Sequence, residues 1–254
     1  MAIMTKDFYD RVAKKFGGYG QGRSLEYTKE FTNGDPEVTF KDKILELASK
    51  DKIALDIGCA DGWFTTKVSP QFKKVYGIDT SKVNLEIANG HKNKEGIKNV
   101  EYSFQDAANT NFNDSFFDLA YCRRGPTYFA EYYRILKPGG HYLEIKIGER
   151  DAMGIKKVFG RGQDFGEWDN SRMDKDIGEL KKLGFETIFS ENYNYSEYYP
   201  TYEALDLFLQ GVPIFENYDT KKDKAKLDEY ISQNSSQKGI ALPRHRAVLV
   251  AKKI

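Results

Sequence analysis

Acidic and glycine residues follow an apolar run at a spacing that suits a nucleotide-type ligand. The run over residues 53–57 contains Asp56 and leads into Gly58 and Gly62, and a helical pattern begins at Trp63. Small residues let a ligand approach the backbone of such a loop, and the free N–H groups at a helix start favour an electronegative group. A strand, a tight loop and a helix would place Asp56 at the sheet edge where open α/β sheets bind ligands.

A second acid follows the next predicted strand, over residues 74–79. Asp79 ends this strand about 20 residues after Gly58, the separation expected of an acid that hydrogen-bonds a ribose diol. Thr80 and Ser81 then begin a helix. Capping of that helix is the alternative role for Asp79, and the upstream glycine loop favours the ribose role.

The glycine loop does not match the dinucleotide fingerprint Gly-x-Gly-x-x-Gly, because Trp63 stands where the third glycine would pack closely. It reads Asp-x-Gly-x-x-x-Gly and resembles the first motif of the class I S-adenosylmethionine-dependent methyltransferases, Asp/Glu-x-Gly-x-Gly-x-Gly. The departure is Ala60, a small residue at the middle glycine. A second signature of that family is the turn over residues 136–140, Leu-Lys-Pro-Gly-Gly, between a helix and a strand. The resemblance covers about residues 50–147.

The resemblance implies that S-adenosylmethionine is the cofactor. Asp106, which follows a predicted strand over residues 99–104, would contact the adenine amino group with help from the backbone of Ala107. Arg123 or Arg124 could hold an anion, either the carboxylate of the cofactor or an acidic substrate; a solvated charge at a helix start is the alternative. The expected cofactor-binding residues are Asp56, Gly58, Cys59, Ala60, Gly62, Asp79, Thr80, Asp106, Ala107 and Arg123.

The N-terminal segment suggests a cover for this site. Apolar residues recur on one face of a predicted helix over residues 5–16, and a glycine-rich stretch over 17–22 then ends the helix. This start is similar to the N-terminal lid of small-molecule methyltransferases; a plain surface helix with a hinge is the alternative. We expect substrate contacts from Tyr19, Arg124 and Arg161.

The predicted fold is a doubly wound, seven-stranded, mainly parallel α/β sheet of the Rossmann-like methyltransferase type. A helical lid is expected over residues 1–50, and the methyltransferase domain over 51–254. Within that domain, the segments 148–170 and 196–239 are expected to be additions on the substrate side, the second of them inserted before the last strand.

Other candidate reactive groups are interpreted as structural. Cys122 is expected to be a buried thiol inside a strand rather than a nucleophile, and its spacing from Cys59 does not suit a metal site. His245, on a predicted last strand over 240–251, is a conceivable base, although a surface position is favoured. Pro243 is expected to limit regular pairing to the residues after it. A general base is optional for a good nucleophile, and no catalytic residue is assigned.

Composition narrows the choice of function. The chain of 254 residues has a formal net charge of +1, so it lacks the global basic field typical of non-specific nucleic-acid binding. With two cysteines, no signal-peptide pattern and no long apolar run, a cytoplasmic location is expected and no membrane partner. We expect methyl transfer to a small-molecule metabolite. The alternatives are a ribosomal or transfer RNA base methyltransferase, which Arg123–Arg124 and Lys156, Lys157 and Arg161 would support, and a non-catalytic cofactor-binding protein. The oligomeric state is left open.

Overall fold

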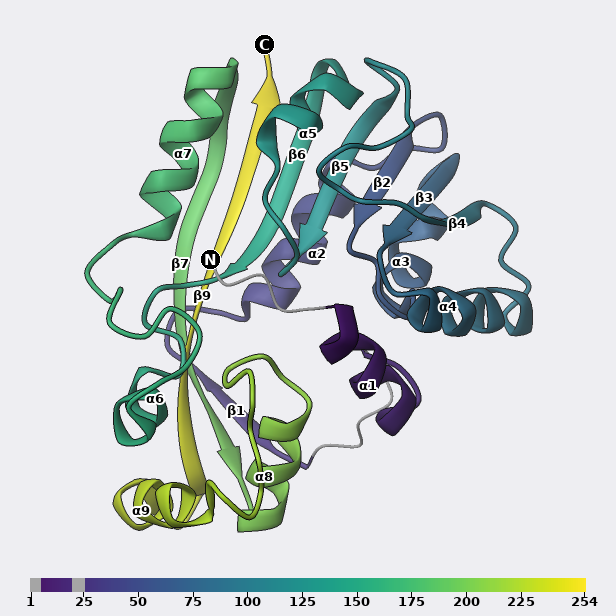
Figure 1. Ribbon diagram of the computed structural model, residues 1–254. Helices are drawn as coiled ribbons and strands as arrows, with labels where there is room; N and C mark the ends of the chain where they lie inside the picture. Colours follow the sequence, from purple (N-terminus) through teal and green to yellow (C-terminus); the bar gives the residue numbers. More distant parts are fainter. Residues whose placement is uncertain (1–5, 20–25) are drawn as a thin grey trace.

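A computed structural model describes residues 6–19 and 26–254 of the chain (Figure 1). The strands are β1 (Thr28–Phe31), β2 (Ile53–Ile57), β3 (Lys74–Asp79), β4 (Val100–Phe104), β5 (Phe117–Arg123), β6 (Leu136–Ile147), β7 (Phe185–Tyr199), β8 (Ser235–Ser236) and β9 (Gly239–Lys253). The helices are α1 (Lys6–Phe16), α2 (Pro36–Leu47), α3 (Trp63–Val68), α4 (Lys82–Lys94), α5 (Phe129–Ile135), α6 (Met153–Phe159), α7 (Arg172–Leu183), α8 (Tyr202–Gln210) and α9 (Lys224–Asn234), with a short 3-10 helix at Ser69–Gln71.

These strands form one mixed sheet in the order β1-β7-β9-β6-β5-β2-β3-β4, with β8 paired to β9. Strands β4, β3, β2, β5 and β6 are parallel, and β9 runs antiparallel between β6 and β7. The chain order therefore reverses between β2 and β5, which is where open α/β sheets bind their ligands. The doubly wound, mainly parallel fold is confirmed.

Helices pack on both faces of the sheet. Successive residues of a strand point to opposite faces, and here both faces carry apolar side chains that must be covered. On one face Leu55 and Ile57 pack with Phe129 of α5 and Leu180 of α7. On the other face Ala54 and the neighbouring strands pack with α2 and α3, through rings such as Phe40 and Phe64. Each face has its own apolar core, and the loops at the strand ends remain available for a site.

The sheet is larger than the seven strands expected, because the described residues contribute nine. The sixth predicted strand, over 185–189, continues as β7 to Tyr199, since buried and less buried residues alternate along the tyrosine-rich stretch. The extra length of β7 offers an edge with which β1 pairs.

The prediction for Pro243 was wrong: β9 begins at Gly239, and Pro243 lies opposite Ser196 in the β7–β9 ladder. The carbonyl of Pro243 accepts from Ala152 N–H at 3.1 Å. The carbonyl and nitrogen of one strand residue face the same side, so the missing N–H interrupts no bond to β7.

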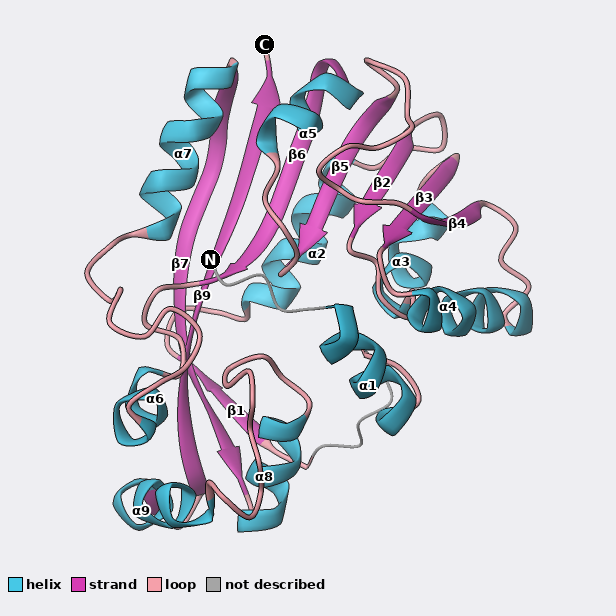
Figure 2. Cartoon of the chain, in the orientation of Figure 1, coloured by secondary structure: helices cyan, strands magenta, loops and turns pink. Residues whose placement is uncertain are grey.

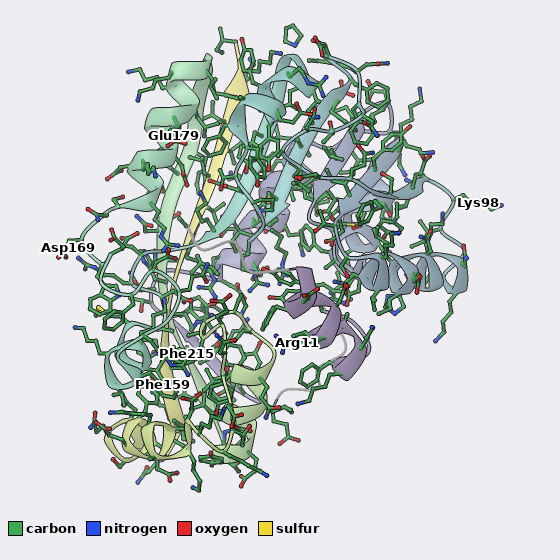
Figure 3. All side chains as sticks on the ribbon, in the orientation of Figure 1. Arg11, Lys98, Phe159, Asp169, Glu179 and Phe215 are labelled. Atoms are coloured by element: carbon green, nitrogen blue, oxygen red, sulfur yellow. The ribbon has the colours of Figure 1, made fainter. Side chains whose placement is uncertain are left out.

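Strands β7 and β9 extend past the end of β6 and carry a second layer, which Figure 2 shows below the main sheet. We call this layer the cap: helices α6, α8 and α9, the loops 160–163 and 211–223 beside them, and the strand segments 195–199 and 239–244. It has its own apolar cluster, in which the rings of Phe159 and Phe215 stack at 4.3 Å (Figure 3). The cap contains most of the segment 196–239 and, from the segment 148–170, helix α6 and the loop that follows it.

Candidate active site

The loop between β2 and α3 combines an open glycine with a crowded one. Gly58 has φ +70°, and the N–H groups of Gly58 and Cys59 both donate to the carbonyl of Ile78, at 2.9 and 3.0 Å. A Cβ on Gly58 would lie 3.8 Å from Cδ of Pro126, an ordinary van der Waals distance, so this position is not crowded by the protein. A Cβ on Gly62, with φ +72°, would lie 2.7 Å from Cζ of Tyr102. Gly58 therefore leaves space, whereas Gly62 is needed for packing.

Ala60 holds the position at which the resembled motif has glycine. Its φ is +48°, in the left-handed region where a residue with a Cβ is disfavoured by about 1–2 kcal/mol. Its N–H donates to Oδ2 of Asp79 at 2.9 Å. This bond ties the glycine loop to the end of β3 and compensates for the strained backbone.

Asp79 connects three segments at the end of β3. Besides the bond from Ala60, its Oδ1 accepts from Ser81 N–H at 2.8 Å, next to Thr80. Burial raises the pKa of Asp79, and the backbone N–H donors oppose that rise. Ser81 also caps α4, since its Oγ accepts from Asn84 N–H at 3.1 Å. Helix capping is thus the work of Ser81, which leaves the ribose role of Asp79 as a prediction.

Helix α1 lies across this edge of the sheet (Figure 1). Ser81 Oγ donates to Oδ1 of Asp10, and Phe8, Val12 and Ala13 are buried. The predicted contact residue Tyr19 packs its ring against Tyr9 of α1, with ring centroids 5.2 Å apart. The N-terminal helix therefore packs beside the end of β3 and the start of α4, and its role as a lid stays a prediction.

Asp56 does not point into the crevice, contrary to expectation. It is 2% exposed, and its Oδ2 accepts from Thr65 Oγ1 at 2.7 Å on the α3 side of the sheet. Burial raises its pKa to about 7, and the Thr65 hydrogen bond opposes the rise. Alternation along β2 places Asp56 on the same face as Ala54. In this arrangement its side chain positions α3 rather than facing a ligand.

Asp106 and Ala107 follow β4 at the same edge. Asp106 is exposed and its Oδ1 accepts from Ala108 N–H at 2.9 Å, which shapes the turn. Ala107 is buried against the sheet core. Their contact with adenine stays a prediction.

Arg123 and Arg124 share a carboxylate that sequence reasoning missed. Arg123 Nε lies 2.8 Å from Oε2 of Glu37, in the first turn of α2, and Arg124 Nη1 lies 3.7 Å from Oε1. Burial would raise the pKa of Glu37, but the two guanidinium charges outweigh it and bring the pKa to about 2. Glu37 reads in sequence as an ordinary acid at a helix start. Arg123 is thus already paired with Glu37. Its contact with the cofactor stays a prediction, and it would be made while this ion pair persists.

The predicted substrate contact Arg161 and the two lysines that would support RNA binding, Lys156 and Lys157, are buried or engaged by other side chains. Arg161 lies in the cap, where its Nη2 reaches both carboxylate oxygens of Asp223 at 2.8 and 2.7 Å. Lys156 is only 3% exposed, and burial lowers its pKa to about 8. Lys157 lies over the ring of Trp168 at 5.0 Å. Arg161 therefore has a structural partner distant in sequence.

The expectation that His245 lies on the surface was wrong, whereas the buried thiol of Cys122 is confirmed. His245 is 5% exposed; its Nδ1 accepts from Arg150 N–H at 3.3 Å, which leaves the proton on Nε2 to donate to Asn192 Oδ1 at 3.2 Å. Both ring nitrogens are occupied and burial lowers the pKa. His245 is a structural residue in this arrangement.

A buried ionic network at the junction of sheet and cap was also missed. Asp151 accepts from Arg244 Nε at 2.9 Å and from Arg246 Nη1, and Arg244 Nη1 donates to Glu197. All four side chains are under 7% exposed. The available signal was the alternation of two arginines along the last strand, at positions whose neighbours on the same face are apolar.

Among residues 6–19 and 26–254 no group of acidic, histidine or cysteine side chains could hold a metal ion, and no described helix is long and apolar enough to cross a membrane.

Comparisons with known proteins converge on one family. A family model described as a methyltransferase domain matches residues 54–140. The uncharacterized methyltransferase YcgJ of Bacillus subtilis is 28% identical over 124 residues, which are 46% of this chain and 48% of the relative. Demethylmenaquinone methyltransferase of Geobacillus sp. is 28% identical over 120 residues, 43% of this chain and 51% of the relative. The chain thus spans about half the length of these curated relatives.

Solved structures share the fold at low identity. The crystal structure of YcgJ from Bacillus subtilis aligns with a TM-score of 0.61 at 18% identity, covering 85% of this chain and 98% of that one. The [4+2]-cyclase SpnF aligns with a TM-score of 0.61 at 19% identity, covering 98% and 94%. Geranyl diphosphate C-methyltransferase from Streptomyces coelicolor, in complex with geranyl diphosphate and S-adenosyl-L-homocysteine, aligns with a TM-score of 0.55 at 16% identity, covering 86% and 78%.

Proposed function

Because the chain belongs to the class I S-adenosylmethionine-dependent methyltransferases, we propose that it transfers the methyl group of S-adenosylmethionine to a small molecule. The observation that carries the proposal is the pairing of an open glycine with an acid at adjacent strand ends. Gly58 leaves space beside the backbone, and Asp79 lies one strand away with its loop held by Ala60. These residues fit a ribose-bearing ligand that runs along the strand ends.

The residues of this chain would bind, orient and shield the reactants. When bound, S-adenosylmethionine supplies a methyl group that its sulfonium has already activated. Asp79 would hold the ribose hydroxyls, Asp106 the adenine amino group, and the loop from Gly58 to Gly62 the remainder of the cofactor. Helix α1 would exclude water from the reactants. Orientation of the acceptor toward the activated methyl group would accelerate the transfer, and no general base is assigned.

Two measurements test the proposal. Calorimetry should show S-adenosylmethionine binding by the wild-type chain and none by Gly58→Val, whose β-branched side chain would fill the open space beside the loop. Circular dichroism of the variant confirms that it folds. If Gly58→Val binds like the wild type, the loop is not the cofactor site.

The acceptor is then sought with S-adenosylmethionine carrying a deuterated methyl group. Cell extract is separated into metabolite and RNA fractions, and mass spectrometry locates the label. Label in the metabolite fraction supports the proposal. The cyclase name of one structural neighbour shows that this fold also serves other reactions. Cofactor binding without label in any fraction would therefore favour the non-catalytic alternative.

The RNA alternative has lost part of its basis. Lys156 is buried and Arg161 is paired with Asp223, so neither offers a free charge to a phosphate backbone. An RNA-binding face would give affinity that falls steeply with salt. Submicromolar RNA binding with a steep salt slope, reduced in Lys157→Ala, would favour RNA over a metabolite.

A further inference from the structure

The buried network at the junction of sheet and cap contains an arginine with an unused donor. Arg246 lies opposite Ile147, the last residue of β6, and is 1% exposed. Its Nη1 donates to Asp151 Oδ1 and, at 2.8 Å, to the carbonyl of His245. Its Nε is buried, and no described residue accepts from it. An unpaired buried donor is costly, more so when it is charged.

The buried network and the neighbouring end of β5 together have more positive than negative charge. Asp151 is shared by Arg244 and Arg246, and Glu37 is shared by Arg123 and Arg124. Glu197 offsets one of these guanidinium charges through Arg244.

Two further charges nearby, the cation Lys156 and the anion Glu149, offset each other and leave this excess unchanged. Lys156, within the influence of Asp151, forms no ion pair among the described residues. Glu149 lies 3.9 Å from His245 and accepts from Arg172 N–H, and Arg172 is itself paired with Asp164. The excess cation therefore belongs to Arg123 and Arg124, whose side chains are 23% and 30% exposed, and it adds to the attraction of this sheet edge for an anion.

The position of Arg246 relates it to the proposed reaction. Ile147 of β6 lies opposite Arg246, and Ile145 of β6 lies opposite Arg123, so the two arginines sit at the same edge of the sheet. Strand β9 is two strands from β5, a lateral separation of about 10 Å. Arg246 is thus one small-molecule length away from the end of β5, beyond the strands that would carry the cofactor.

We propose that the methyl acceptor carries a carboxylate, and that Arg246 binds it through the Nε side of its guanidinium. This inference rests on the proposed function. With Nη1 engaged by Asp151, the Nε–Nη2 edge presents two parallel N–H groups, the fork that matches the two oxygens of a carboxylate.

The surroundings suit a planar acid. The ring of Tyr195 is buried near the two arginines: burial raises its pKa, and the charges of Arg246 and Arg244 oppose that rise. Tyr27 stacks on Tyr199 with ring centroids 5.4 Å apart. Aromatic walls contribute contact area to a flat ligand, and exclusion of water strengthens its attraction to a guanidinium.

The test uses benzoate as the probe and benzyl alcohol as its neutral counterpart, with the full chain saturated with S-adenosyl-L-homocysteine. Titration calorimetry should show benzoate binding by the wild type and no binding of benzyl alcohol. Arg246→Met should weaken benzoate about 10- to 100-fold, the range expected for a lost charge-assisted hydrogen bond. Arg150→Met is the matched control, because the Arg150 side chain is 61% exposed and faces Asp169 at 3.9 Å; it should bind benzoate like the wild type.

Arg246→Lys keeps the charge but removes the fork, so it should lose benzoate affinity while retaining the ion pair to Asp151. This second variant decides the matter if Arg246→Met does not fold. Unchanged affinity for S-adenosyl-L-homocysteine shows that the variants keep the cofactor site. The proposal is overturned if the wild type does not bind benzoate, or if Arg246→Lys binds benzoate with the affinity of the wild type.

Inorganic phosphate is the third probe. Binding of phosphate but not benzoate, lost on Arg246→Lys, would overturn the carboxylate assignment in favour of a phosphate. Failure of the wild type to bind S-adenosyl-L-homocysteine would refute the proposed function instead, a readout separate from the benzoate titration.

Discussion

Gly62→Ala should destabilise the protein far more than Gly58→Ala, although both glycines have nearly the same backbone angle. Their φ values are +72° and +70°, so each substitution incurs the left-handed penalty of about 1–2 kcal/mol. They differ in surroundings. A Cβ at Gly62 would meet Cζ of Tyr102 at 2.7 Å and Cβ of Ala88 at 3.0 Å. The nearest atom to a Cβ at Gly58 would be Cδ of Pro126, at 3.8 Å.

The crowding sets the size of the difference. Carbon atoms normally pack about 3.5–4.0 Å apart, so Tyr102 would have to move by about 1 Å. Overpacking of this kind costs about 1–3 kcal/mol. Adding the left-handed penalty, we expect Gly62→Ala to lower the free energy of unfolding by about 2–5 kcal/mol. At about 2–4 °C per kcal/mol for a chain of this size, Tm falls by about 4–20 °C.

Urea unfolding and thermal melts of both variants measure this difference, and calorimetry with S-adenosylmethionine measures the second consequence. Gly58→Ala should fold with a small loss of stability yet bind the cofactor more weakly, since its new methyl group occupies open ligand space. In a Tyr102→Leu background the cost of Gly62→Ala should shrink toward the left-handed penalty alone. Equal losses for the two glycine variants, or no relief from Tyr102→Leu, would refute the packing argument.

Four further predictions follow from single contacts. Asp79→Ala should weaken S-adenosylmethionine binding by about 1.5–3 kcal/mol without unfolding the chain, and calorimetry showing unchanged affinity would contradict the ribose role. Ala60→Gly should raise the free energy of unfolding by about 1 kcal/mol, because it relieves a left-handed alanine at φ +48°; a loss in urea unfolding would count against that strain. Asp151→Asn should cost about 3–5 kcal/mol at pH 7, since two buried arginines lose a shared charge. The pKa of Asp151 is lowered in the fold, so its contribution is present above pH 4 and should disappear as the pH falls. Lys156→Met should stabilise the chain by about 2 kcal/mol at pH 7, because burial lowers the pKa of Lys156 to about 8. The benefit should vanish as the pH rises from 8 toward 10.5, and a benefit independent of pH would argue against a charged buried lysine.

The strand-end acids and the glycine loop could be predicted because they depend on local order. Gly58, Gly62 and Asp79 occur where a strand must end and a helix begin, and each lies at the expected edge of the sheet. Asp56 was placed at the correct strand end, yet its side chain faces α3. That outcome depends on which face of β2 receives the helix, and a strand of five residues with apolar neighbours on both faces does not reveal this.

The chain order of strands and helices, with its two methyltransferase-like turns, was sufficient to predict the parallel sheet and the sheet edge at which the glycine loop lies, because backbone geometry at short range governs both. Contacts between distant segments decided the rest. Glu37 meets Arg123 across 86 positions, and Asp151 meets Arg244 across 93. Alternation along β9 could mark Arg244 and Arg246 as facing the apolar side of the strand, but nothing in the sequence identifies the distant acid that pairs with each arginine. The long β7 and β9 place the cap at the sheet edge, where Asp151, Arg244 and Arg246 are buried and the Nε of Arg246 has no partner among the described residues.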